Sequence, residues 1–124
     1  ELGISQQVLQ FNLDDDSLAY FYQNALAFIF PSLYEGFGIP VLESFACGCP
    51  LLCSNVSSLP EVAGNAACYF DPYSEESIRD AVVKLLDDSN FREELIDKGY
   101  EQLKKFSWKQ TSEETKKIYE SVLI

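Results

Sequence analysis

Residues 27–43 have the sequence AFIFPSLYEGFGIPVLE, which predicts a short strand, a glycine-containing loop and the start of a helix, in that order. The apolar run 27–30 predicts a buried strand. Gly36 and Gly38 allow backbone conformations that other residues avoid, and Pro40 is favoured in a first helical turn. Backbone amides at such a helix start lack intrahelical partners and carry partial positive charge. The segment therefore predicts a site for an anion such as a diphosphate.

Two carboxylates stand at the ends of this loop and helix start. Glu35 precedes the glycines, and Glu43 lies eight positions later, about one turn into the predicted helix. Because carboxylates accept hydrogen bonds from vicinal hydroxyls, Glu43 is predicted to hold a ribose and Glu35 a second sugar, on either side of a diphosphate. A nucleotide sugar has this layout. The structural alternative is that Glu43 complements the helix dipole, Glu35 is solvated and the glycines only make a turn.

The sequence of residues 31–50, PSLYEGFGIPVLESFACGCP, resembles the Glu-x7-Glu signature of the family-4 retaining glycosyltransferases, which have the GT-B fold. Further segments that resemble this family follow in order at 54–64, 70–72 and 106–108. The resemblance extends over nearly the whole chain from Val8. It implies transfer of a sugar from a nucleotide donor to an acceptor hydroxyl with retention at the anomeric carbon, and it implies no required metal and no cofactor.

The resemblance also assigns roles by position. It implies that Glu35 is the catalytic-site carboxylate that contacts the donor sugar and that Glu43 binds the ribose hydroxyls. The other implied substrate-binding residues contribute mainly backbone groups near the sugar and phosphates: Gly36, Phe37, Gly38, Ile39, Val41 and Leu42. Because residues 34–43 are most similar to mannosyltransferases of that family, the expected donor is GDP-linked mannose, with UDP-linked donors as the alternative. The expected process is polysaccharide or glycoconjugate assembly.

The charge distribution leaves the predicted diphosphate site without a cation. All nine Lys and Arg residues lie at or after Arg79. A leaving nucleoside diphosphate needs its charge stabilised, and helix amides supply only part of that. In the resembling family an Arg and a Lys near the start of the same domain face the phosphates, and no residue before Glu35 can act as either. We therefore expect a fragment in which residues 1–124 are part of a C-terminal nucleotide-sugar-binding domain.

The expected partner of this fragment is a separate N-terminal domain of the same protein, because 124 residues suffice for one compact domain and GT-B enzymes have two. The isolated chain is expected to lack transferase activity. No apolar run approaches the roughly 20 residues of a membrane span, so no direct membrane insertion is expected. The net charge of −11 disfavours nucleic acid and anionic lipid as partners. We expect a cytoplasmic protein whose membrane contacts, if any, involve the N-terminal domain.

The four cysteines do not have the spacing of the common zinc sites, and the chain has no histidine. They are expected to be free thiols in a reducing compartment: Cys47, Cys49, Cys53 and Cys68.

Two other function classes have partial support. Residues 14–16 are three aspartates after a predicted strand, as in the magnesium-binding acidic pocket of a signalling receiver domain. Such a domain also needs a further aspartate and a lysine after later strands, and residues 30–31 and 70–71 supply no such set, so helix capping is the favoured explanation. A GT-B sugar-nucleotide epimerase or phosphorylase is a further alternative, but such enzymes normally carry a histidine or a cofactor lysine in the site.

The expected fold class is α/β, a Rossmann-like parallel sheet with flanking helices that forms part of the C-terminal domain of a GT-B fold. The predicted strands are 8–11, 27–30, 51–53 and 66–70. The helices predicted between them include a segment capped within 12–16 that carries Leu18, Phe21, Tyr22 and Ala25 on one face, then 41–47, ended by Gly48 and Pro50, and 59–63.

Helices are predicted to fill the remainder of the chain. After the cap candidate Ser74, one face of a helix is apolar through Ile78, Ala81, Val82, Leu85 and Leu86. The pairs Asn90 with Glu93 and Ser107 with Gln110 have capping-box spacing and predict two more helix starts. The last helix presents an apolar face that we expect to be partly exposed, since in the resembling family it braces the N-terminal domain: Trp108, Ile118, Tyr119 and Val122.

Overall fold

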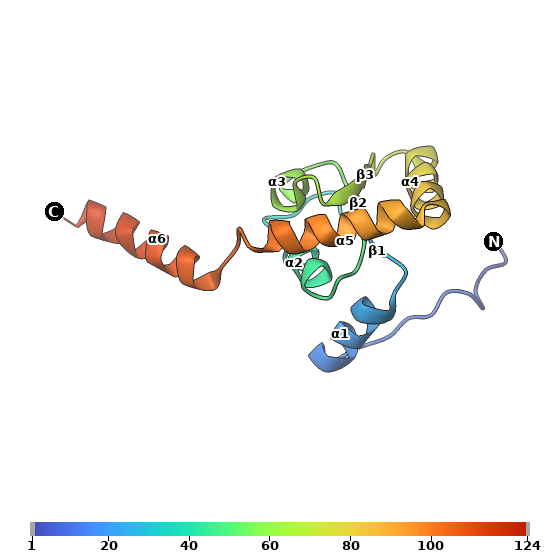
Figure 1. Ribbon diagram of the computed structural model, residues 1–124, viewed down its shortest axis with the longest axis horizontal. Helices are drawn as coiled ribbons and strands as arrows, with labels where there is room; N and C mark the ends of the chain where they lie inside the picture. Colours follow the sequence, from blue (N-terminus) through green and yellow to red (C-terminus); the bar gives the residue numbers. More distant parts are fainter. Residues whose placement is uncertain (1, 124) are drawn as a thin grey trace.

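The computed structural model describes residues 2–123 and contains a three-stranded parallel sheet flanked by helices (Figure 1). The strands are β1 (Phe28–Phe30), β2 (Leu51–Ser54) and β3 (Ala67–Phe70), and their order in the sheet is β1-β2-β3. Consecutive parallel strands require crossover connections, and helices α2 and α3 lie within them. The predicted α/β class and three of the four predicted strands are confirmed.

Six helices cover the described part of the chain: α1 (Asp15–Asn24), α2 (Ile39–Ala46), α3 (Leu59–Ala63), α4 (Glu75–Asp87), α5 (Ser89–Leu103) and α6 (Trp108–Val122). Side-chain caps begin several of them, as predicted. The Asp14 carboxylate accepts the Ser17 amide at 2.9 Å, and the Ser74 hydroxyl accepts the Ser77 amide at 3.1 Å. Ser107 caps α6 in the same way.

The core has two parts, one on each face of the sheet. All four residues of β2 are buried, because this central strand is covered on both sides. Leu51 and Cys53 point into a cluster formed with α2 and α3, whereas Leu52 belongs to a cluster formed with α4 and α5. This two-sided burial is what a parallel sheet requires, and it explains why residues 51–54 form a continuous apolar run rather than an alternating one.

Helix α5 connects the two sides of the molecule, because it contacts both α2 and α4 (Figure 1). It packs against α2 at Gly99, where an added Cβ would lie 2.8 Å from the Phe45 ring. Phe45 is one of the largest fully buried side chains. Glycine at position 99 therefore leaves room for the Phe45 ring where α5 packs against α2.

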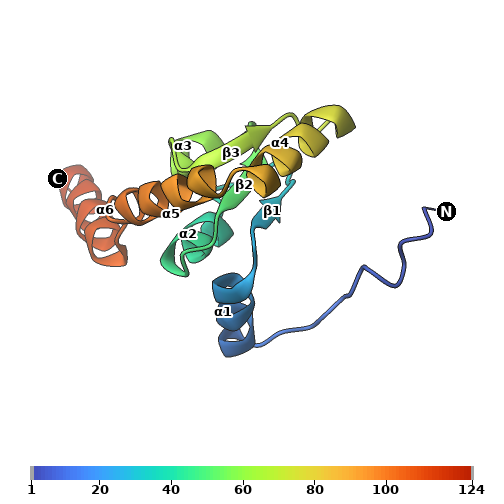
Figure 2. The same cartoon turned by 45° about the vertical axis from the view of Figure 1, so that its right-hand side comes forward.

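The predicted strand at 8–11 is wrong. Val8, Leu9 and Phe11 are 63%, 72% and 55% exposed, and the segment pairs with no strand of the described chain. Figure 2 shows it running away from the sheet beyond α1. An apolar run becomes a strand only where backbone hydrogen bonds are available, and among the described residues β1 pairs with β2 alone. As one of the two edge strands of the described sheet, β1 is also less buried than predicted, with Ile29 43% exposed.

Two details of the predicted helices also need correction. Helix α5 begins two residues earlier than the Asn90 capping box indicates, because the Asp88 carboxylate accepts the Phe91 amide at 2.9 Å. Asp88 is both the C-cap of α4 and the N-cap of α5, so no separate turn connects the two helices. In the α4 stripe, Leu86 is 50% exposed and does not join the core that Ile78, Ala81, Val82 and Leu85 help to form.

The expected exposed face of the last helix is confirmed. Helix α6 projects from the end of α5 away from the sheet (Figures 1 and 2), and none of its described residues is buried. Its exposed apolar residues include Trp108, Ile118, Tyr119 and Val122. Within residues 2–123, no helix combines the length and apolarity needed to cross a lipid bilayer.

We expect Gly99→Ala to destabilise the protein by about 1–3 kcal/mol, because the new methyl group would overlap the buried Phe45 ring. Glycine-to-alanine changes inside helices normally stabilise by up to about 1 kcal/mol, so the sign of the effect is diagnostic. Urea unfolding measures it. Glu93→Ala, an exposed change on the same helix, is the control and should stay within about 0.5 kcal/mol of the wild type.

Candidate functional site

The loop between β1 and α2 depends on Gly38. Its φ of 97° lies in the left-handed region, and an added Cβ would come within 2.8 Å of Leu59 Cδ2. Gly36 differs from the sequence prediction: it does not have a positive φ, and a Cβ there would meet nothing within 4 Å. Gly38 is therefore the residue that uses glycine's conformational freedom, whereas Gly36 leaves the outer side of the loop open to an approaching group.

Helix α2 starts without a side-chain cap, because its N-cap is Gly38 and Pro40 occupies the first turn. The Val41 amide donates to the Gly38 carbonyl at 3.0 Å, and the Val41 side chain is fully buried. The start of α2 therefore presents backbone groups, and no acidic side chain lies in its first turn. This arrangement leaves room for an anion at the positive end of the helix dipole.

Two serines from the loop after β2 hold the β1–α2 loop in place. The Ser57 hydroxyl lies 2.8 Å from the Glu35 carbonyl and 3.1 Å from the Glu35 amide. The Ser58 hydroxyl lies 3.0 Å from the Glu35 carbonyl and 2.9 Å from the Phe37 carbonyl. Ser57 itself adopts a positive φ of 58°, which is uncommon for a residue with a side chain. Both carbonyls at the centre of the loop are thus fixed by hydroxyl donors.

The site prediction did not include these serines. The signal for them was a pair of small hydroxyl residues shortly after a buried strand. Because parallel neighbours end at the same edge of a sheet, the loops after β1 and β2 lie beside each other, and Ser57 and Ser58 are placed next to Glu35.

The two carboxylates occupy different surroundings. The Glu35 carboxylate accepts the Ser32 hydroxyl at 2.8 Å within the loop. The Glu43 carboxylate lies toward α1, where the Tyr22 hydroxyl donates to its Oε2 at 3.4 Å. Across residues 2–123 no hydrogen bond joins the two glutamates. The structure therefore gives each carboxylate its own neutral donor, which orients it and leaves its negative charge in place.

A hollow of about 210 Å³ lies between α1 and α2 beside Glu43. Its walls are formed by Asp15, Leu18, Ala19, Tyr22, Glu43, Ala46 and Cys47. Burial and the neighbouring Glu43 carboxylate raise the pKa of the Tyr22 phenol above its ordinary value, so this hydroxyl stays protonated and acts as a donor.

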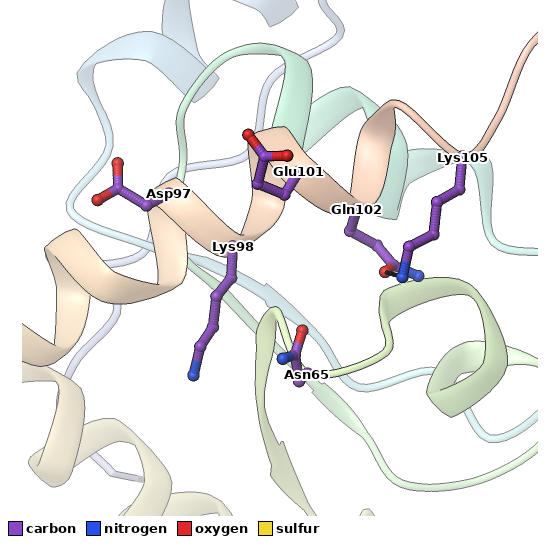
Figure 3. Close-up of a pocket in the computed structure, with 6 residues that line it drawn as sticks. All are labelled: Asn65, Asp97, Lys98, Glu101, Gln102 and Lys105. Atoms are coloured by element: carbon purple, nitrogen blue, oxygen red, sulfur yellow. Dashed lines mark hydrogen bonds between the residues drawn. The ribbon is translucent and has the colours of Figure 1, made fainter.

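A larger hollow, of about 390 Å³, lies along α5 and contains none of the predicted site residues (Figure 3). Figure 3 shows Asn65 across from side chains of α5. Several polar side chains of this larger hollow already have partners: Lys105 donates to the Gln102 side chain at 2.7 Å, and Gln102 donates to the Val62 carbonyl at 2.9 Å. Lys98 forms an ion pair with Glu94. We therefore assign the functional site to the β1–α2 loop by its chemistry rather than by the size of the hollow.

The β1–α2 loop, α1 and α2 themselves carry no basic side chain, since every Lys and Arg lies on or after α4. Among residues 2–123 no three Asp, Glu or Cys side chains are grouped so as to hold a metal ion. The Asp14 carboxylate is used as the α1 cap, which agrees with the capping explanation of the aspartate run. The four cysteines are free, and burial raises the pKa of Cys53 to about 12.

Comparison with known proteins identifies the family. The family described as "Glycosyl transferases group 1" matches residues 1–102. The chain belongs to this glycosyl transferase family. Over 105 residues it is 43% identical to the O-antigen chain mannosyltransferase B of Escherichia coli. The aligned region covers 85% of this chain and 28% of that relative. The chain therefore spans less than a third of the length of this relative.

Solved structures agree with this assignment. The C-terminal domain of a glycosyl transferase group 1 family protein from Francisella tularensis is 25% identical, with a TM-score of 0.70 over 83% of this chain and 55% of that one. A sucrose-phosphate synthase from Thermosynechococcus elongatus superimposes with a TM-score of 0.82 at 24% identity, over 93% of this chain and 30% of that one, and supports the fold alone. The glycosyl transferase resemblance and the predicted Rossmann-like fold are thus both confirmed.

We expect the two loop glycines to differ in their effect on stability. Gly38→Ala forces a side chain into the left-handed region against Leu59 and should destabilise by about 1–3 kcal/mol. Gly36→Ala adds a methyl group in open space and should change the free energy of unfolding by less than about 0.5 kcal/mol. Urea unfolding of both variants measures the difference. Equal losses of unfolding free energy would contradict the left-handed backbone conformation of Gly38.

Proposed function

We propose that this chain supplies part of the donor site of a retaining glycosyltransferase that moves mannose from a nucleotide sugar to an acceptor hydroxyl. The observation that carries the proposal is the loop and helix start bounded by Glu35 and Glu43, in a chain of the glycosyl transferase group 1 family. The mannosyltransferase relative supports the sugar, and its O-antigen name supports a role in polysaccharide assembly. GDP-linked mannose is the proposed donor, with UDP-linked donors as the alternative.

In this proposal the donor lies along the loop. Glu43 accepts hydrogen bonds from the ribose hydroxyls beside the hollow between α1 and α2, and Glu35 contacts the transferred sugar as the catalytic-site carboxylate. The backbone of residues 36–39 contacts the sugar hydroxyls and phosphates, for which the open space around Gly36 leaves room. The start of α2, which has no side-chain cap and has Val41 and Leu42 in its first turn, stabilises the diphosphate through the helix dipole, because the Val41 amide itself already donates to the Gly38 carbonyl.

Neutralisation of the leaving diphosphate must involve groups outside this loop, because no cation lies in it or on α1 or α2. We propose that another part of the full-length protein, including an N-terminal domain, supplies these cations and most of the acceptor site. The isolated chain is then inactive, since a cleft between two domains is incomplete in it. Independence from a metal and a cytoplasmic location remain parts of this proposal.

The two glutamates should respond differently to mutation in the full-length protein. Glu43→Ala should weaken binding of the nucleoside diphosphate about tenfold or more, because hydrogen bonds to a charged group contribute about 1.5–3 kcal/mol each. Glu35→Ala should leave nucleoside diphosphate affinity unchanged and lower kcat for transfer by at least about a hundredfold. Isothermal titration with GDP and with UDP, together with transfer assays, measures both properties.

Glu93→Ala, on the exposed side of α5, is the matched control and should alter neither affinity nor kcat. Unchanged nucleotide affinity in Glu43→Ala would contradict the ribose role of Glu43. Full transfer activity in Glu35→Ala would contradict the sugar-contact role of Glu35. Binding of neither GDP nor UDP by the folded full-length wild type would overturn the donor-site proposal as a whole.

A further inference from the structure

Tyr22 is held rigidly at the boundary between α1 and the sheet. It is the buried residue of α1, with 8% of its surface exposed. Its ring stands edge-on to the Phe28 ring at 5.1 Å and 89°, and Phe28 stacks on Phe30 at 5.6 Å. Because Phe28 and Phe30 are residues of β1, their packing against the Tyr22 ring fixes the direction of the Tyr22 hydroxyl.

This hydroxyl has one hydrogen-bond partner in the described structure, the Glu43 carboxylate, 21 residues away in sequence. It donates to Oε2, and no donor from residues 2–123 reaches Oε1. A phenylalanine at position 22 would pack as well, whereas the hydroxyl of a buried tyrosine costs free energy unless it finds a hydrogen-bond partner. The contact therefore satisfies the Tyr22 hydroxyl and also gives the Glu43 carboxylate a hydrogen-bond donor.

A glutamate side chain on a helix surface can adopt several rotamers. A ligand that binds only one of them has lower affinity, because the side chain loses its freedom to adopt the others. Glu43 borders the hollow between α1 and α2, so its carboxylate has room to turn. A fixed donor on one oxygen restricts that freedom. It also leaves the other oxygen available to a ligand.

We propose that Tyr22 is a positioning residue, whose hydroxyl holds Oε2 of Glu43 so that the carboxylate is presented to the donor ribose in one orientation. The inference rests on the ribose role proposed for Glu43. The effect of Tyr22 on the donor passes through its contact with Glu43.

The test compares a nucleoside diphosphate with its 2′,3′-dideoxy analogue, which lacks the hydroxyls that Glu43 is proposed to bind. Titrations use full-length protein and either GDP or UDP, whichever the wild type binds more tightly. Tyr22→Phe keeps the ring and removes the donor. It should weaken binding of the natural diphosphate about fivefold to tenfold, the effect of one hydrogen bond to a charged group, and leave the dideoxy analogue unaffected. Tyr20→Phe, an exposed change on the same helix, should alter neither affinity.

A double-mutant cycle gives a second, independent measurement. In a Glu43→Gln background, Tyr22→Phe should have little further effect on affinity, because the two residues act through one contact. Additive losses would overturn the inference. So would an equal loss for both ligands in Tyr22→Phe, which would mean a purely structural role.

The outcomes also separate this inference from the proposed function. A wild type that prefers the natural diphosphate over its dideoxy analogue, with the same preference in Tyr22→Phe, overturns the role of Tyr22 and leaves that of Glu43 standing. A wild type that binds both ligands equally, or binds no nucleotide, overturns the ribose role of Glu43, and the role of Tyr22 falls with it.

Discussion

The left-handed backbone of Gly38 is the constraint on which the site geometry depends. It turns the chain from the β1–α2 loop into α2 while Leu59 packs against the position where a side chain would be. That turn directs Val41 and Phe45 into the core and leaves Glu43 on the side that faces α1. A change in this single residue would therefore alter the loop, the helix start and the position of the ribose-binding candidate together.

The parallel sheet brings the rest of the site to the loop. Strands β1 and β2 end at the same edge, so the segment after β2 lies beside the segment after β1. Ser57 and Ser58 use this proximity to hold the carbonyls of Glu35 and Phe37. These bonds fix the loop without placing any charge in it. A loop held in this way loses little freedom when a ligand binds, which favours affinity.

Neutral hydroxyl donors also hold both glutamates. Ser32 donates to Glu35, and Tyr22 donates to Glu43. Had lysine or arginine taken these positions, much of the negative charge would be compensated, and the oxygens would be less available to sugar hydroxyls. The basic residues instead lie on or after α4, where several form surface ion pairs with neighbouring acidic residues. The loop and α2 thus provide strong acceptors for hydroxyl groups, whereas among their own groups only backbone amides can stabilise phosphate.

The sequence by itself determined the features that depend on neighbouring residues. The caps Asp14, Ser74 and Ser107, the buried run of β2 and the loop before α2 all follow from preferences that act within a few positions. The resemblance to the family signature assigned roles to Glu35 and Glu43 from the same local stretch, since their spacing is a property of one loop and one helix turn.

Only the tertiary structure decided which distant residues meet. The pairing of Tyr22 with Glu43 joins two helices, and the contacts of Ser57 and Ser58 with the loop join two crossovers of the sheet. The apolar segment 8–11 has the local preference of a strand but remains unpaired in the described structure. Strand pairing and side-chain contacts across more than 20 residues depend on how the elements pack, and local sequence preference contains no information about the partner.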